Sequence, residues 1–444
     1  MTDTAKPIRR PVHVVYGGAD RFSAETPEKL GRIALGAIGS YVHDFVEFAR
    51  MFEFEGSKDL PHWPGAVAEL GAAADFDPQS LRSENFAAWF AWNVYEKTIE
   101  KLKNEPVEDF RIDFEDGYGF RTDAEEDSHA IKASTELATA FREGTIRSFS
   151  GFRIKALGRE THERAVRTLV QFLNNFLERT EGGLPENFVV TLPKVTAREQ
   201  VKDLCERLAA IESDRGLAAN SIGVEVMIET PESIIGPDGR FAVRELVDEA
   251  QGRCTSVHFG AYDYTAALGI SASYQDIRHP ACHFARQIMQ TALAGTGVRL
   301  VDSVTTLMPV PRHKGDDLTE RQRTENQEAV HTAWQRHFRN VTASMAEGFY
   351  QSWDLHPNQL VARYAAVYAF FLSEFDSQAT RLRGYMEKAT KATLTGNTFD
   401  DAASVAGIVN FFERGIACGA FGEDEIIDAV GAPIEDLSRQ FKPN

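Results

Sequence analysis

Two acidic residues, Glu229 and Asp263, stand where short apolar runs end and the chain turns. The runs are Gly223-Val-Glu-Val-Met-Ile-Glu229 and Val257-His-Phe-Gly-Ala-Tyr-Asp-Tyr264, and their β-branched and aromatic residues are typical of buried strands. Neighbouring strands lie about 4.8 Å apart, so carboxylates at the ends of consecutive strands can share one hard cation. We expect Mg²⁺, because proteins commonly hold it with one or two carboxylates.

More polar side chains fall at the other expected strand ends. They are Glu115, Asp116, Lys194, Asp302 and His356, together with Arg153 inside the third expected strand. An unpaired arginine is costly to bury, so Arg153 either pairs with a carboxylate such as Asp113 or binds a substrate carboxylate through its bidentate fork. Glu115 and Asp116 either hydrogen-bond metal-bound water or position Arg153, or they form an ordinary acidic turn. His356 is better explained as the end of a strand than as a donor.

Glu225 needs a separate explanation from Glu229, although both lie in the same apolar run. Four residues along a strand span about 13 Å, so Glu225 is expected at the other end of the strand on the same face. We therefore expect it to make a structural ion pair or hydrogen bond.

Strand-like and helical segments alternate along most of the chain. The expected strands are 12–17, 110–114, 151–156, 188–192, 224–228, 256–259, 298–301 and 350–355. The expected helices between and after them are 123–143, 159–180, 197–215, 231–251, 280–295, 319–347 and 358–374. Eight strands, each followed by a helix, predict a (β/α)8 TIM barrel, with a doubly wound sheet as the alternative. In such a barrel the catalytic groups come from the carboxyl ends of the strands.

Two helical additions accompany the predicted barrel. The barrel is expected over residues 11–375, and its first connection, 26–102, is a helical insertion of two or three helices broken by proline and glycine. Residues 376–444 form an amphipathic C-terminal appendage. The charged segment 309–317 is expected to be a solvated loop rather than a lid.

Composition narrows the class of protein. The net charge of −18 argues against a nucleic-acid or anionic-membrane binder. The four cysteines form no CxxC pair and no run of about 18 apolar residues occurs, which indicates a reduced, cytoplasmic protein without a disulfide framework or membrane span. Phosphate-binding glycine motifs are absent as well.

A series of motifs resembles one enzyme family. The motifs are Arg111-Ile-Asp-Phe-Glu-Asp-Gly117, Phe152-Arg-Ile154, Leu192-Pro-Lys-Val195, Met227-Ile-Glu-Thr230, Phe259-Gly-Ala-Tyr-Asp-Tyr264 and Leu355-His-Pro-Asn-Gln359. In this order they resemble the citrate lyase β-subunit-like and malyl-CoA lyase group of the HpcH/HpaI aldolases, over roughly residues 11 to 375. Val12-His-Val-Val-Tyr-Gly-Gly-Ala-Asp-Arg21 is similar to the group's opening strand and loop.

The resemblance implies a reaction class. Glu229 and Asp263 would bind Mg²⁺, with Mn²⁺ as the alternative ion, Arg153 would bind a substrate oxygen, and Glu115 and Asp116 would support the metal shell. The implied chemistry is reversible carbon–carbon cleavage through an enolate. The substrate would be a small 2-oxo acid, hydroxy acid or acyl-CoA, and the protein a homo-oligomer, a trimer or hexamer.

Some features depart from the family pattern. The segments Thr26–Leu102 and Pro309–Gly348 are longer than the family's usual connections, and Gly419-Ala-Phe-Gly-Glu-Asp424 resembles the acidic C-terminal lid of the coenzyme A-using members only faintly. The lid's role is not transferred, so a free acid is as good an expectation as a thioester. The alternatives are a barrel that uses phosphoenolpyruvate or pyruvate, and a non-catalytic barrel that serves as a binding module.

Overall fold

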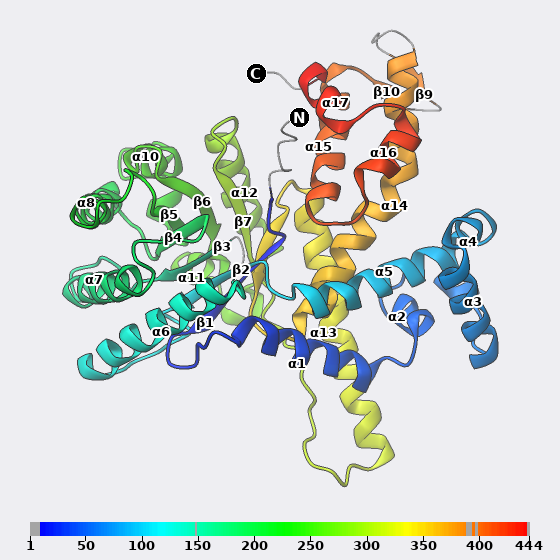
Figure 1. Ribbon diagram of the computed structural model, residues 1–444, viewed down its shortest axis with the longest axis horizontal. Coiled ribbons are helices and arrows are strands. Elements are labelled where there is room, and N and C mark those ends of the chain that lie inside the picture. Colours follow the sequence, from blue (N-terminus) through cyan, green and yellow to red (C-terminus); the bar gives the residue numbers. More distant parts are fainter. Residues whose placement is uncertain (1–8, 147–148, 388–392, 396–397, 442–444) are drawn as a thin grey trace. The chain divides into compact units, whose positions relative to one another are not determined.

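The computed structural model describes residues 9–146, 149–387, 393–395 and 398–441, and its central element is a closed barrel of eight parallel strands in sequence order (Figure 1). The strands are β1 (His13–Gly18), β2 (Asp109–Asp113), β3 (Phe149–Arg153), β4 (Asn187–Leu192), β5 (Gly223–Ile228), β6 (Cys254–Phe259), β7 (Arg299–Val304) and β8 (Gln351–Asp354). Because β1 pairs with both β2 and β8, the sheet closes. The predicted TIM barrel is confirmed, and the doubly wound alternative is wrong.

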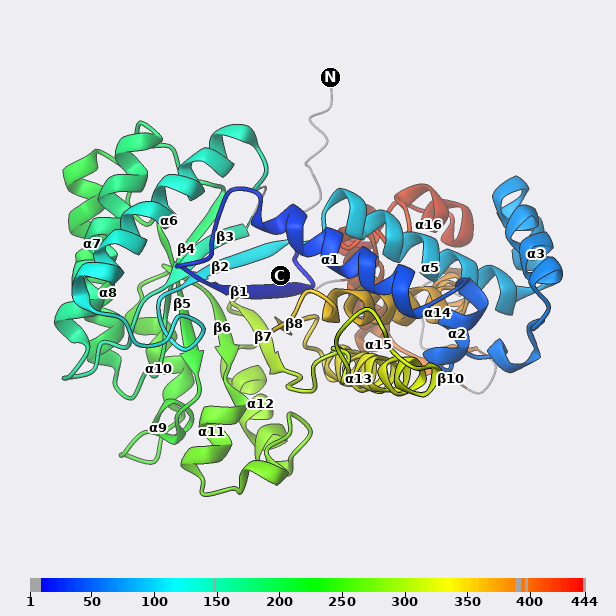
Figure 2. The same cartoon turned by 90° about the horizontal axis from the view of Figure 1, so that it is seen from below.

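Helices follow the strands around the barrel (Figure 2). They are α6 (Asp123–Glu143), α7 (His162–Arg179), α8 (Arg198–Arg215), α9 (Pro231–Ile234), α10 (Ala242–Glu249), α11 (Ala261–Ala267), α12 (Pro280–Leu293) and α13 (Glu320–Ala346). None of the helices in the described part of the chain combines the length and apolar character needed to cross a membrane.

Aromatic packing fixes α7 on the outside of β3 and β4. Phe172 stacks on Phe152 with ring centroids 4.0 Å apart, and Phe176 stacks on Phe188 at 5.3 Å. The two helical residues lie four positions apart, so they face the sheet together. Where the two strands pair, a Cβ on Gly151 would lie 2.0 Å from the carbonyl oxygen of Val189, and only glycine allows this approach.

A buried charged layer fills the lower part of the barrel. Arg111 donates through Nε and Nη2 to the two oxygens of Glu225, at 2.6 and 2.7 Å, and also pairs with Asp109. Glu225 accepts further hydrogen bonds from Thr191 and Ser256, at 2.7 and 2.5 Å. The expected structural ion pair of Glu225 is therefore present. Although burial opposes it, Arg111 and His258 hold the pKa of Glu225 well below its ordinary value.

Two of the predicted strand boundaries are wrong, and each error changes where a polar residue lies relative to the end of its strand. The third strand ends at Arg153, so this arginine stands at the strand end rather than inside the strand. The seventh strand continues to Val304, which places Asp302 within β7. Asp302 is buried and accepts hydrogen bonds from Arg286 and Ser344, both on surrounding helices. Asp302 thus anchors helices outside the barrel.

The structure divides into two compact units, residues 13–36 with 102–360, and residues 1–12 with 37–101 and 361–444. The first unit holds the barrel. The second is helical in its described part, apart from a short β9 (Thr393–Thr395) and β10 (Thr398–Asp400) pair. Helices α1 (Thr26–Tyr41) and α14 (Gln359–Glu387) each contribute to both units, as does α5 (Phe86–Asn104) with its last three residues. The other helices of the second unit are α2 (Phe45–Met51), the short 3₁₀ helix η1 (Ser57–Asp59), α3 (Pro64–Phe76), α4 (Pro78–Glu84), α15 (Ala402–Ala417), α16 (Glu423–Val430) and α17 (Ile434–Phe441).

Contacts inside the helical unit join parts of the chain that are far apart in sequence. Arg82 of α4 pairs with Asp376 of α14 at 2.7 Å and lies over the rings of Trp89 and Phe375. The first connection contains five α-helices, not two or three, because α3 and α4 are separated by the single residue Asp77. The domain limits 11–375 and 376–444 stay a prediction.

Candidate active site

Arg153 forms a buried ion pair at the carboxyl ends of β2 and β3. Its Nε and Nη2 donate to the two carboxylate oxygens of Asp113, at 2.7 and 2.6 Å. Asp113 also accepts from the backbone N–H groups of Glu115 and Gly117, at 3.0 and 2.7 Å. The first of the two readings of Arg153, a pair with Asp113, is therefore present. The remaining Nη1 lies 3.1 Å from Glu115, and the role in substrate binding stays a prediction.

Lys194, two residues after β4, connects the predicted site residues. Its ammonium donates to Glu115 at 2.6 Å and to both oxygens of Asp116 at 3.1 Å, and lies 3.8 Å from Asp263. Its backbone N–H donates to Glu229 at 2.6 Å. Its φ of 49° lies in the left-handed region, which a lysine adopts at a cost of about 1–3 kcal/mol when surrounding structure enforces it.

Glu229 directly follows β5 and points into a space that a glycine keeps open. A Cβ on Gly260 would lie 2.4 Å from the Cβ of Glu229 and 2.6 Å from its Oε2. Only glycine therefore lets the two strand ends approach with Glu229 in this position. Asp263 lies in the first turn of α11, not at the end of β6, because the chain becomes helical at Ala261. Its side chain is half exposed, whereas Glu229 is buried.

Burial gives Glu229 an unusual protonation behaviour. Desolvation, helped by the nearby negative charge of Asp263, raises the pKa of Glu229 to about 8, while Arg153 and Lys194 act in the opposite direction. The pKa of Lys194 is raised above its ordinary value, because its carboxylate neighbours outweigh its burial. Glu229 therefore keeps a buried proton at neutral pH that a positive ion would displace, and Lys194 stays charged.

The five predicted site residues form one connected cluster. Arg153 and Lys194 both contact Glu115, Lys194 contacts Asp116, and Lys194 also approaches Glu229 and Asp263. Among the described residues, no three His, Cys, Asp or Glu side chains form a ready metal cluster. Two carboxylates suffice for Mg²⁺, which keeps several water or substrate oxygens. The raised pKa of Glu229 beside Asp263 also fits a site that gains from a divalent cation.

The sequence did not reveal what lies directly beneath Arg153. The ring of Tyr16 lies under its guanidinium, 4.9 Å from centroid to Cζ, and stacks on Trp353 with centroids 4.3 Å apart. The Tyr16 hydroxyl is 3.0 Å from Nδ1 of His258, whose Nε2 is 2.9 Å from Glu225. Tyr16 thus joins the upper cluster to the buried lower layer. The alternation of polar residues along β2, β5 and β6 was the signal that these side chains face inward.

Two hollows flank opposite ends of the barrel. One, of about 380 Å³, lies beside the carboxyl ends of β1 and β8 and is lined by residues that include Tyr16, Arg21, Phe22 and His356. Burial lowers the pKa of His356, and its Nδ1 accepts from the backbone of Asn358, which agrees with its reading as a strand-ending residue. The hollow contains both apolar and basic groups.

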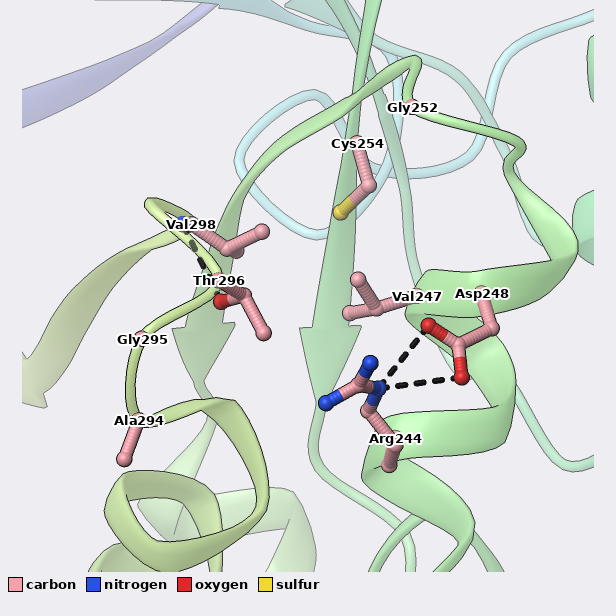
Figure 3. A pocket seen from close by; sticks show the side chains of 9 residues that line it. All are labelled: Arg244, Val247, Asp248, Gly252, Cys254, Ala294, Gly295, Thr296 and Val298. Carbon is pink, nitrogen blue, oxygen red and sulfur yellow. Dashed lines mark hydrogen bonds and ion pairs between the residues drawn. The ribbon is translucent and has the colours of Figure 1, made fainter. Parts of the chain in front are cut away.

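The other hollow, of about 370 Å³, lies at the amino ends of β6 and β7 (Figure 3). There Arg244 donates through Nε to both oxygens of Asp248, at 2.8 and 2.9 Å. Burial raises the pKa of the Cys254 thiol to about 12, so this cysteine is a poor nucleophile. This end of a barrel generally serves stability.

The sequence matches the profile of DUF6986, described as a domain of unknown function, over residues 3–443. No curated protein sequence matches the chain. Among solved structures, a citrate lyase from Burkholderia xenovorans LB400 aligns with a TM-score of 0.53 and 18% identity, over 76% of this chain and 92% of that one. The chain therefore shares its barrel fold with that protein.

Two further structures are more distant. The lead(II) complex of Haloferax volcanii malate synthase has a TM-score of 0.44 and 16% identity, over 76% of this chain and 90% of its own. The citrate lyase beta subunit of M. tuberculosis, complexed with oxaloacetate and magnesium, has a TM-score of 0.36 and 17% identity, over 62% of this chain and 92% of its own.

Proposed function

The chain belongs to the DUF6986 family, and we propose that it is a Mg²⁺-dependent lyase or aldolase that makes or breaks a carbon–carbon bond of a small carboxylate-bearing substrate. The observation that carries the proposal is the cluster of Glu229, Asp263, Lys194 and Arg153 at the carboxyl end of the barrel, where such folds hold their active sites. The fold shared with a citrate lyase supports the reaction class.

Glu229 and Asp263 would hold the divalent cation. Bound there, it would supply Lewis-acid stabilisation of negative charge on a substrate oxygen. The half-exposed Asp263 and the buried Glu229 give one side of such a site solvent access and the other a low dielectric. The low dielectric strengthens every charge interaction on that side.

Arg153 would add fixed positive charge next to the substrate. Asp113 holds its guanidinium at two nitrogens and the ring of Tyr16 supports its face, so its orientation is set before substrate arrives. Such preorganised charge is effective because it needs no reorganisation during the reaction. Glu115 and Asp116 would support the metal shell and hold Lys194 in place.

The substrate class follows from these charges. A 2-oxo acid, a hydroxy acid or an acyl-CoA with a carboxylate would meet two cations, Arg153 and Lys194, beside the metal position. The proposal includes a cytoplasmic homo-oligomer, a trimer or hexamer, with a barrel domain at 11–375 and an appendage at 376–444.

Hydrogen–deuterium exchange tests the proposal. Pyruvate, other 2-oxo acids and acyl thioesters would be incubated in D₂O. Their methyl or methylene protons should exchange for deuterium only when both enzyme and Mg²⁺ are present, and NMR measures the exchange. Glu229→Gln should abolish the exchange, whereas Asp248→Asn, which neutralises an acid at the other end of the barrel, should not. Absence of exchange with every compound of the panel would contradict the lyase proposal. Phosphate release from phosphoenolpyruvate would favour the alternative of a phosphoenolpyruvate-using barrel. Metal binding without turnover would favour a non-catalytic binding module.

A further inference from the structure

The ammonium of Lys194 lies among carboxylates that belong to two separate groups. It bonds Glu115 and Asp116, which follow β2, at 2.6 and 3.1 Å. It is also 3.8 Å from Asp263, which follows β6 and would hold the metal. One ammonium therefore stands between the acidic turn and the proposed metal ligands.

Lys194 contacts Glu229 through its backbone, and it contacts the other carboxylates through its side chain. The backbone N–H holds Glu229 at 2.6 Å, and this bond does not depend on the side chain. The ammonium holds Glu115 and Asp116, and the Lys194 side chain is about one-third exposed, so the ammonium has a path toward solvent. A substitution can thus remove the charge while keeping the bond to Glu229.

The charges near Lys194 do not balance. At neutral pH four carboxylates, Asp113, Glu115, Asp116 and Asp263, face two cations, and the three guanidinium nitrogens of Arg153 are directed at Asp113 and Glu115. Lys194 is consequently the cation that lies next to the more exposed acids, Asp116 and Asp263.

We propose that the Lys194 ammonium competes with the divalent cation for these carboxylates and keeps metal affinity low enough for ready exchange. This inference rests on the proposed metal site. A single and a double positive charge about 5 Å apart repel strongly enough, even at the dielectric constant of water, to change a binding constant about tenfold. With the cation bound, the Lys194 ammonium would turn from Asp263 toward Glu115, Asp116 and solvent.

Calorimetric titration with Mg²⁺, at one fixed pH for all variants, tests the competition. Lys194→Gln should bind Mg²⁺ about tenfold or more tightly than the wild type. Lys194→Arg keeps the charge and should stay within about threefold of it. Lys202→Gln removes an equally positive but distant, exposed side chain on α8, and should leave the affinity unchanged. Thermal unfolding of each variant confirms that it is folded.

The wild-type protein provides a second measurement that needs no variant. Acylation of Lys194 by an amine-specific reagent, followed by mass spectrometry, should increase when Mg²⁺ saturates the protein, because the ammonium loses its contact with Asp263. Lys202 provides the internal reference. Unchanged labelling of Lys194 under saturating Mg²⁺ would overturn the competition.

The two proposals fail in different ways. Equal or weaker Mg²⁺ binding by Lys194→Gln, with wild-type binding that Glu229→Gln abolishes, overturns the competition and leaves the metal site standing. If neither the wild type nor Lys194→Gln binds Mg²⁺, the metal site itself fails, and the competition with it.

Discussion

Two charged layers follow one another along the barrel strands, and they differ in how completely their charges are paired. In the lower layer, Arg111 and Glu225 are inaccessible to solvent, and the hydrogen bonds of Glu225 to its neighbours in the barrel are 2.5 to 2.9 Å long. In the upper layer, the side chains of Lys194, Asp263 and Asp116 are 34%, 46% and 58% exposed. The closed layer holds the barrel together, and the open layer has charge available for a ligand.

Removing the arginine of each layer should produce the largest difference. Arg111→Met leaves Asp109 and Glu225 as buried carboxylates, and should lower the free energy of unfolding by about 3–5 kcal/mol. Arg153→Met should cost roughly half as much, because Asp113 keeps two backbone N–H donors. Urea denaturation measures both. A larger loss in Arg153→Met would reverse the assignment of the layers.

Neutralising the upper acids should remove metal binding without unfolding the protein. Glu229→Gln and Asp263→Asn should each weaken Mg²⁺ binding at least about 100-fold, equivalent to about 2.7 kcal/mol, because each deletes one of two ligands. Calorimetry measures the affinity, and Asp248→Asn is the matched control. Unchanged binding in both variants would place the metal elsewhere.

The raised pKa of Glu229 predicts how metal binding depends on pH. Its folded-state pKa of about 8 exceeds the unfolded value, so the folded protein binds this proton more tightly, and Glu229 costs stability as pH rises between the two values. Mg²⁺ must displace the proton. The apparent affinity for Mg²⁺ should rise roughly tenfold per pH unit from pH 6 to 8, which is about 1.4 kcal/mol per unit, and should level off above pH 8. A flat profile would contradict the buried proton.

The exposed pair at the opposite end of the barrel should matter least. Arg244 and Asp248 are both about half exposed, so Arg244→Met should change the free energy of unfolding by less than about 1 kcal/mol. Mg²⁺ affinity should not change. A loss as large as that of Arg111→Met, in the same urea titration, would show that this end of the barrel is not simply a solvated surface.

The sequence predicted the barrel because its signals are local. Helix α6 matches its expected range of 123–143, since Thr122 and Glu125 form a capping box and Gly144 ends the helix in the left-handed conformation. The same local logic failed at Asp263, where a seven-residue helix begins within an aromatic run typical of a strand. It failed again at Asp302, whose strand continues past the expected end.

The candidate site was only partly predictable for a different reason. The five predicted residues do lie in one cluster, because strand ends converge whatever their side chains do. The central place of Lys194 depends on a left-handed backbone and on contacts with residues that follow three different strands, and no pattern of residue types encodes either. The pairing of Arg153 with Asp113 was one of two readings until the register of β2 with β3 set them side by side.

The stack of Trp353 on Tyr16 gives the molecule an optical sensor. The indole lies 4.3 Å from the tyrosine ring and 5.9 Å from the Arg153 guanidinium, and it is nearly excluded from solvent. Because indole emission responds to the electric field around the ring, an anion that binds Arg153 should shift the fluorescence of Trp353. Candidate substrates can then be screened by emission alone, before any product has been identified.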